Sequence, residues 1–196
     1  MLVLERASEP AQFILIKNEN LNNGRGLWVS PGGRWNPGVS SPDASLRERI
    51  ESEVNFKSEI CTIGSIDENM PAAGEWDSIA CRWFRAPHLL LFEHLSSVRT
   101  DFPLAHLDLV YVCRTNGTSA GRAPKYGPAT QIRLPVESCA ETFDAAHNAL
   151  SRAVDDWYMS TTGQRPAKRD EIVADVVWRL HLVARAFDQR KAQVVA

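Results

Sequence analysis

The chain of 196 residues has few cysteines and no long apolar run. Cys61, Cys81, Cys113 and Cys139 are widely spaced, without CxxC pairs or a neighbouring His at zinc spacing. This excludes a zinc finger or ribbon and predicts reduced, mostly buried thiols. The apolar runs are far shorter than a membrane span, and residues 1–10 lack the pattern of a signal peptide. We therefore expect a soluble, cytoplasmic protein that does not contact a membrane.

An excess of positive charge is also missing. The chain has 22 basic and 24 acidic residues, for a formal net charge of −2, and the two kinds are mixed along its length. A nucleic-acid-binding face or a polybasic membrane surface is therefore not expected. No internal repeat or low-complexity segment is visible. The length and the 44% hydrophobic content are sufficient for one well-buried domain.

The hydrophobic pattern predicts strands flanked by helices. Strands are expected at residues 12–17, 27–29, 60–66, 88–95, 107–114 and 129–134, and helices at residues 42–54, 142–159 and 168–193. The strand at 107–114 is almost continuously apolar, which suggests a central position in a sheet. Between this strand and the next, residues 115–127 read as a flexible loop.

The stretch that organises the chain is LWVSPGGRWNPGVSSPDASLRERIESEVNF, residues 27–56. It reads as a strand, a glycine loop at Gly32-Gly33, a polar loop and an acidic amphipathic helix. Glycines let a backbone approach a ligand closely, and a following helix can present carboxylates to a cation. The stretch resembles the Nudix box of the Nudix hydrolases. The usual form of that box is GG, five residues, Glu, seven residues, then Arg-Glu-apolar-x-Glu-Glu-x-Gly-apolar.

Spacing alone permits two registers of this helix on the box. Counting forward from Gly33 aligns Arg47-Glu48 with the Arg-Glu pair of the family and Glu51 with a metal-binding glutamate. The same count puts Arg49 at the apolar core position. Burying an unpaired arginine costs several kcal/mol, whereas one extra loop residue costs little. This count is therefore the less favourable register.

The second register follows from the apolar residues of the helix. Leu46, Ile50 and Val54 are spaced four apart and define one buried stripe centred on Ile50. With the stripe on the core positions, Glu53 aligns with the last metal-binding glutamate of the box. Asn55 takes the place of the family's glycine, and asparagine is the best substitute where a helix ends in left-handed geometry. In this register the box keeps one metal-binding carboxylate and loses two.

The second register also aligns Glu48 with the family's arginine and Arg49 with its first helical glutamate. This exchange, together with GGR at 32–34, looks like the variant box of the GDP-mannose mannosyl hydrolases. That Nudix branch holds Mg²⁺ with a glycine-loop carbonyl, one box glutamate and a residue from elsewhere. The resemblance implies that the carbonyl of Gly33 and the carboxylate of Glu53 hold Mg²⁺ or Mn²⁺, and that Glu53 is catalytic.

The resemblance also implies the fold. We expect a Nudix α/β/α sandwich, in which a mixed sheet lies between helices, with extra C-terminal helices. Residues 1–160 would form the Nudix-like domain, and residues 161–196 a helical extension packed on the same domain. In that extension Ile172, Val176, Leu180, Val183 and Phe187 lie on roughly one side. This side would suit a homodimer contact or a partner groove, or would pack on its own domain.

Further site residues are assigned with alternatives. His106 and Asp108 share one strand face, and His106 is our candidate general base; the other reading is a histidine that begins a strand. Arg49 would either clamp a substrate phosphate or pair with Glu53. Acidic residues of a later loop would complete the cation shell or be solvated; these are Asp67, Glu68, Glu75 and Asp77.

The substrate contacts expected near the glycine loop are Arg25, Arg34 and Trp35, in addition to Arg49. The two other arginines would contact phosphate or be ordinary surface residues, and Trp35 would stack on a base or sugar. Trp28, on the other side of the loop, is expected in the core. The function predicted from the resemblance is Mg²⁺-dependent hydrolysis of a nucleoside diphosphate linked to another group. The alternative is a non-catalytic Nudix-fold module that binds a nucleotide ligand or a protein partner.

Overall fold

The computed structural model describes residues 1–7, 9–18, 27–33, 35, 40–60, 89–95, 104–165 and 174–195. The strands are β1 (Leu2–Leu4), β2 (Gln12–Asn18), β3 (Leu27–Val29), β4 (Glu59–Ile60), β5 (Leu89–Leu95), β6 (Leu104–Val110), β7 (Cys113–Thr115) and β8 (Gln131–Pro135). The α-helices are α1 (Pro42–Val54), α2 (Phe143–Thr162) and α3 (Ala174–Val195). Two short 3₁₀ helices, η2 (Pro128–Thr130) and η3 (Val136–Cys139), flank β8. The chain is therefore an α/β protein.

The main sheet has six strands and is mixed. The order of hydrogen-bonded neighbours is β3-β2-β1-β7-β4. β8 lies off this path and also pairs with β2. β1 is parallel to β7, whereas the other pairings in this sheet are antiparallel. β5 and β6 form a separate antiparallel pair. The predicted mixed sheet is thus confirmed among the described residues.

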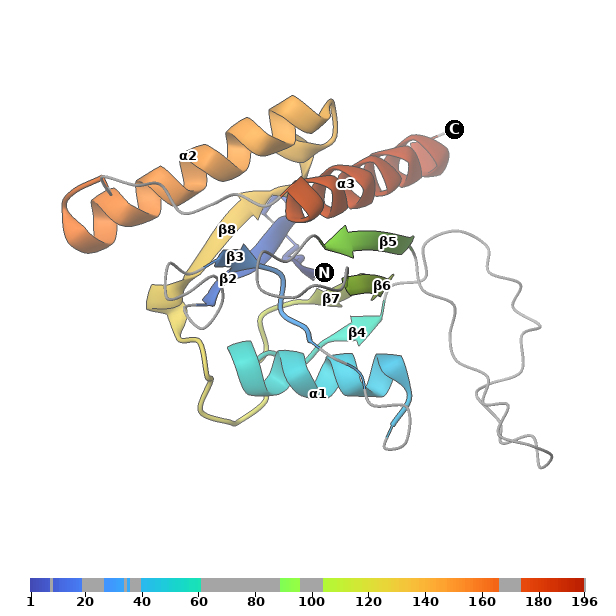
Figure 1. The fold of residues 1–196 in the computed structure, drawn as a ribbon, viewed down its shortest axis with the longest axis horizontal. Coiled ribbons are helices and arrows are strands. Elements are labelled where there is room, and N and C mark those ends of the chain that lie inside the picture. Colours follow the sequence, from blue (N-terminus) through green and yellow to red (C-terminus); the bar gives the residue numbers. More distant parts are fainter. Residues whose placement is uncertain are drawn as a thin grey trace.

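Helices cover both faces of the main sheet. Figure 1 shows α1 below the sheet and α2 and α3 above it. The core on the α1 side contains Leu2, Leu4, Ile14, Ile16, Ile50, Val54, Cys113 and Tyr126. The core on the other side includes Val3, Phe13, Leu15, Trp28, Ala146, Leu150, Val154, Val177, Leu180 and Val183. Successive residues of β1 and β2 therefore alternate between two buried faces, as the period of two along a strand requires.

The ends of α1 follow from its sequence. The helix begins after Ser41, whose hydroxyl oxygen accepts a hydrogen bond from the backbone N–H of Ala44 at 3.4 Å, and Pro42 occupies its first position. It ends at Asn55, which adopts the left-handed conformation with φ of 60° and donates its N–H to the Glu51 carbonyl. The predicted bounds, residues 42–54 with the end at Asn55, are confirmed, whereas the cap at Ser41 was not predicted.

The apolar stripe of α3 is buried within the domain. Val176, Leu180, Val183 and Phe187 are at most 7% exposed and belong to the core shared by the sheet and α2. Their side chains are therefore used for intramolecular packing, which was one of the three uses predicted for this side. Ile172 lies outside the described residues. The homodimer remains a prediction, as does the division between residues 1–160 and 161–196.

The strand predicted at 107–114 is wrong in its continuity. β6 ends at Val110, and the separate strand β7 starts at Cys113. Tyr111 and Val112, between the two strands, are almost fully buried. The sequence is therefore apolar without interruption, although the strand pairing is interrupted there. Of the four cysteines, Cys113 and Cys139 are buried free thiols, and Cys61 and Cys81 lie outside the described residues.

The predicted strand at 60–66 is described only at its start, where β4 reaches Ile60. Within the described residues, none of the helices has the length and apolar content that crossing a bilayer requires.

Candidate functional site

The packing of α1 decides between the two registers. Ile50 and Val54 are 0% and 3% exposed, and Leu46 packs against the same core. The Arg49 side chain is instead 42% exposed. The register that buries Arg49 is therefore wrong, and the register fixed by the apolar stripe agrees with the structure.

Glu53 joins α1 to the glycine loop. Its Oε2 atom accepts a hydrogen bond from the backbone N–H of Gly32 at 3.0 Å, and the residue is only 7% exposed. Burial raises the pKa of the Glu53 carboxyl above the ordinary glutamate value, because the charged form is desolvated. The Gly32 hydrogen bond and the charges of Arg49 and Lys125 lower the pKa, but by less than burial raises it. The site therefore holds a buried carboxylate with two nearby cations.

Arg49 lies one helical turn before Glu53 and close to the second glycine. Its Nη1 atom is 3.9 Å from Oε1 of Glu53, a long ion pair. Its guanidinium carbon lies 2.8 Å from the position that a Cβ atom on Gly33 would take. The missing side chain of Gly33 therefore leaves the space that the guanidinium fills. Pairing with Glu53, one of the two uses predicted for Arg49, is present.

Lys125 was not predicted, and it comes from the segment 115–127 that was expected to be a flexible loop. Its backbone N–H donates to the Ser52 carbonyl at 2.9 Å, and the next N–H, of Tyr126, donates to the Glu53 carbonyl at 2.8 Å. The last carbonyls of a helix have no partner within the helix, and this segment supplies donors for them. After β7 the segment is a loop, as predicted, and these hydrogen bonds attach its end to α1. No sequence motif marks Lys125 as part of the site.

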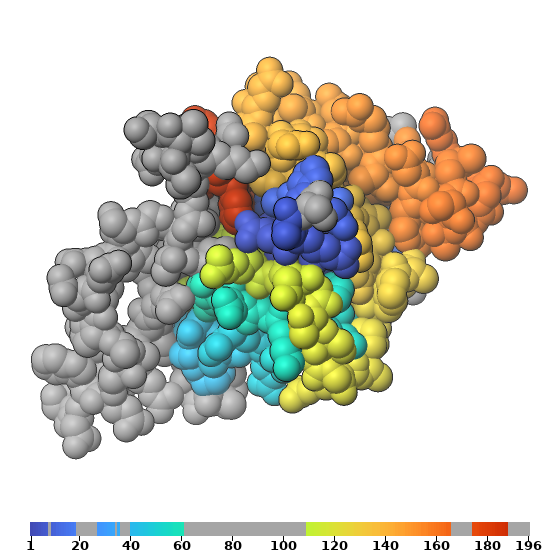
Figure 2. Space-filling model, turned by 180° about the vertical axis from the view of Figure 1, so that it is seen from behind, coloured from blue at the N-terminus to red at the C-terminus, as the bar shows by residue number. Residues whose placement is uncertain are grey.

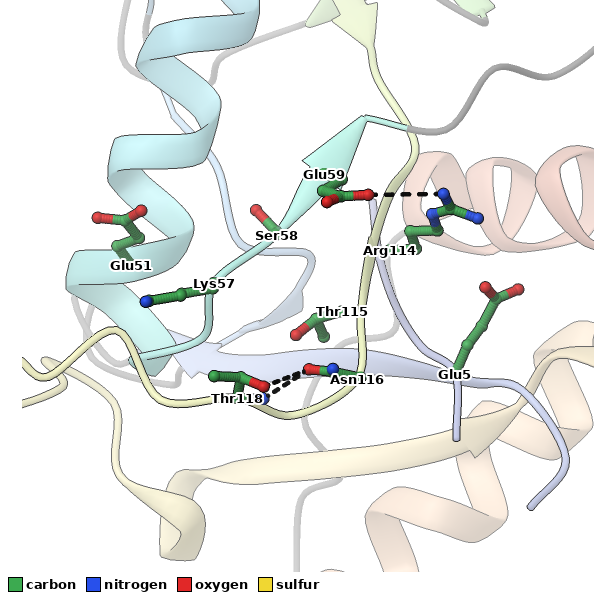
Figure 3. A pocket seen from close by; sticks show the side chains of 9 residues that line it. All are labelled: Glu5, Glu51, Lys57, Ser58, Glu59, Arg114, Thr115, Asn116 and Thr118. Atoms are coloured by element: carbon green, nitrogen blue, oxygen red, sulfur yellow. Dashed lines mark hydrogen bonds and ion pairs between the residues drawn. The ribbon is translucent and has the colours of Figure 1, made fainter. Parts of the chain in front are cut away.

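Glu51, the metal-binding residue of the rejected register, lies in a different place. It lines a groove of about 560 Å³ that Figure 3 shows between the end of α1, β4 and β7. Glu59 and Arg114 form an exposed ion pair of 3.5 Å within this groove. In Figure 2, seen from behind, the N-terminal segment lies beside the segment coloured as residues near 115, which in turn lies beside the segment coloured as residues near 60. The groove thus lies where these segments meet, and it does not include Glu53.

Several predicted substrate contacts were not tested by the structure. Arg25 and Arg34 lie outside the described residues. Trp35 is half-buried, and its indole N–H donates to the carbonyl of Ser40 at 2.7 Å, so the ring is attached to its own loop. Stacking of Trp35 on a base or sugar remains a prediction. Trp28 is 2% exposed and makes an edge-to-face contact with Trp157, which confirms its place in the core.

His106 belongs to β6, where its backbone pairs with Glu93 of β5. Its side chain lies outside the described part of the chain, as does that of Asp108. A general-base role for His106 therefore remains a prediction. The loop acids Asp67, Glu68, Glu75 and Asp77 also lie outside the described residues.

The glycine loop has one carboxylate beside it, that of Glu53, that could bind a metal ion. Within the described part of the chain, no three His, Cys, Asp or Glu side chains lie together as a metal-binding group. Mg²⁺ does not require three, since it commonly takes one or two carboxylates and completes its shell with water and substrate phosphates. Glu53, buried beside Gly32, fits that limited role.

Comparison with known proteins gives no family for the chain. No protein-family model matches it, and no curated protein matches it at a significant level.

Proposed function

We propose that the chain is a Nudix-type α/β/α protein that hydrolyses a nucleoside diphosphate linked to another group, with Mg²⁺ or Mn²⁺ as cofactor. The observation that carries this proposal is the position of Glu53. The register fixed by the apolar stripe aligns Glu53 with the last metal-binding glutamate of the Nudix box. The carboxylate of Glu53 accepts a hydrogen bond from the glycine loop. The layered arrangement of helices on both faces of a mixed sheet supports the same proposal.

The charges around Glu53 suit a diphosphate ligand. Arg49 fills the space beside Gly33, and Lys125 lies close enough to affect the pKa of the Glu53 carboxyl. A guanidinium can bind two phosphate oxygens with its planar fork, and the backbone of a glycine loop can approach a phosphate closely. In the proposed site these groups bind and orient the diphosphate next to the carboxylate.

Glu53 and the carbonyl of Gly33 would hold the cation. When bound, a divalent cation neutralises charge on the diphosphate and lowers the pKa of a water molecule that attacks phosphorus. The chain's own contribution is to fix the carboxylate: the hydrogen bond from Gly32 and the burial of Glu53 restrict its orientation. A rigidly held ligand loses less entropy when the ion binds.

A second candidate function is a non-catalytic Nudix-fold module that binds a nucleotide or a protein partner. The ion pair between Arg49 and Glu53 favours it, because a carboxylate that already has a counter-charge has less need of a metal ion. Under this proposal Arg49 and Lys125 would bind the ligand without a cation.

Turnover measurements distinguish the two functions. We would screen nucleoside diphosphate sugars, ADP-ribose, dinucleotides and nucleoside triphosphates with Mg²⁺ or Mn²⁺. Replacing Glu53 with glutamine removes a charged ligand but keeps the shape of the side chain. Loss of an outer-shell partner in a metal site already costs 10- to 100-fold, so Glu53→Gln should lower kcat/KM about a hundredfold or more.

The matched control is Glu48→Gln, which removes the same charge from an exposed position of α1 and should leave kcat/KM unchanged. Equal activity of Glu53→Gln and the wild type would contradict the metal assignment. If no compound is hydrolysed but a nucleotide binds tightly without metal, the second function is correct.

A further inference from the structure

The carboxylate of Glu53 already has a partner at each of its two oxygen atoms. Oε2 of Glu53 accepts the Gly32 hydrogen bond, and Oε1 faces Nη1 of Arg49 at 3.9 Å. A magnesium ion lies about 2.1 Å from each oxygen ligand, so a cation on Oε1 would lie at most about 6 Å from Nη1 of Arg49. Like charges at such a separation in a half-buried site repel strongly. Arg49 and a cation therefore compete for the same carboxylate.

A bound diphosphate removes this competition. The tip of Arg49 already lies against Gly33, at the loop where the proposed function places the phosphates, and its side chain is 42% exposed. Phosphate oxygens offer the guanidinium two strong, parallel hydrogen bonds, whereas the 3.9 Å contact with Glu53 is too long for a hydrogen bond. The phosphate is thus the stronger partner for Arg49.

We propose that Arg49 is exchanged between two partners: it pairs with Glu53 in the free protein and with the diphosphate in the complex. This inference rests on the proposed function. Its consequence is that the cation binds weakly to the free protein and tightly once the diphosphate has taken Arg49. Because linkage is reciprocal, the cation must raise the affinity for the diphosphate by the same factor.

Lys125 does not change partner in this way. Its ammonium lies 4.9 Å from the centre of the Tyr126 ring, and its effect on the pKa of Glu53 is smaller than that of Arg49. Its backbone is fixed to the end of α1. Lys125 therefore remains a stationary positive charge beside the site, and Arg49 is the residue that changes partner.

The test measures Mn²⁺ binding from the free Mn²⁺ signal in electron paramagnetic resonance. Each protein is titrated alone and with the methylene-bridged analogues of ADP-ribose and GDP-mannose, which cannot be hydrolysed at the bridge. In the wild type an analogue should tighten Mn²⁺ binding about tenfold or more. Direct bridging of Mn²⁺ by phosphate would give the same result, so the variants decide.

Arg49→Gln should bind Mn²⁺ more tightly than the wild type without an analogue, and it should lose most of the coupling. Arg49→Lys keeps the charge and should restore weak Mn²⁺ binding to the free protein. Arg47→Gln removes an equal charge from an exposed position of the same helix and should behave as the wild type.

Three results would overturn the proposal. If Arg49→Gln binds Mn²⁺ no more tightly than the wild type and keeps its coupling, the exchange is wrong while the proposed hydrolase site stands. If the wild type shows no coupling with a bound analogue, the exchange is also wrong. If the wild type binds neither Mn²⁺ nor either analogue, the proposed function fails together with the inference.

Discussion

Glu53 is held in an environment that opposes its charge. It is 7% exposed, and burial raises the pKa of its carboxyl in spite of the Gly32 hydrogen bond and two nearby cations. Carboxylates in ordinary helical positions are exposed, as Glu48 is on the same helix. A desolvated carboxylate kept beside a glycine loop is typical of a functional site, although structural ion pairs can also shift a pKa.

The raised pKa predicts how stability depends on pH. The native state keeps the Glu53 proton to a higher pH than the unfolded state, whose carboxyl titrates near 4.5. The contribution of Glu53 to the free energy of unfolding is therefore largest below that pH and is lost as the pH rises through the raised value. Glu53→Gln keeps a neutral side chain, so its stability relative to the wild type should increase over this window.

Urea unfolding of both proteins between pH 4 and pH 8 measures the difference, with Glu48→Gln as the exposed control. A stability difference that does not change with pH would show that the hydrogen bond and the cations cancel the effect of burial on the pKa of Glu53. A wild type that becomes more stable relative to the variant as the pH rises would show that they outweigh it.

The sequence predicted the position of Glu53 at the site but not that of Lys125. The stripe of Leu46, Ile50 and Val54 fixed the register of α1, because helical periodicity relates residues of one element. The resemblance to the Nudix box then implied that Glu53 lies at the glycine loop. Lys125 could not be found in this way. It reaches the site through backbone hydrogen bonds between segments more than 70 residues apart, which no local pattern encodes.

At the scale of elements, α1 is the clearest success of local rules. Ser41 and Pro42 start the helix and Asn55 ends it, and each of these residues has a known preference for its position. The segment 115–127 shows the limit of such rules. Its glycine and polar content indicated a loop correctly, but the donors that it supplies to the end of α1 depend on the tertiary structure.

The left-handed end of α1 can be tested by two substitutions at Asn55. Alanine at a φ of 60° is strained by its Cβ atom, whereas glycine is not, and both lose the side-chain oxygen that accepts from the N–H of Arg122. Asn55→Ala should therefore be less stable than Asn55→Gly by about 1 kcal/mol.

The comparison isolates the backbone conformation, since the lost hydrogen bond is common to both variants. Denaturant midpoints of the two proteins would measure the difference. Equal stabilities, or a more stable alanine variant, would mean that Asn55 does not hold the left-handed conformation in solution.

For the molecule as a whole, the sheet topology depends on contacts between distant segments. The short strand β1 was not predicted, because three residues are too few to show an alternating pattern. Yet Leu2–Leu4 pairs with both β2 and β7 and contributes side chains to the cores on both faces. The α/β class and the mixed sheet were predicted correctly, whereas the strand order could not be predicted.

The two-sided core also explains how the site is supported. Ile50 and Val54 anchor α1 on one face of the sheet, and β3 leads directly from the sheet into the glycine loop. Both partners of the Glu53–Gly32 hydrogen bond are therefore attached to the same rigid layer. A site built on packed elements in this way holds its groups more precisely than one built on loops alone.

The position of a bound cation tests directly whether Glu53 is a metal ligand. Crystals containing Mn²⁺ and a methylene-bridged analogue that binds would be examined by anomalous scattering. We predict the strongest peak about 2.1 Å from a Glu53 carboxylate oxygen, next to the carbonyl of Gly33. A peak in the groove beside Glu51 and Glu59, or a bound analogue with no peak at Glu53, would show that Glu53 does not hold the cation.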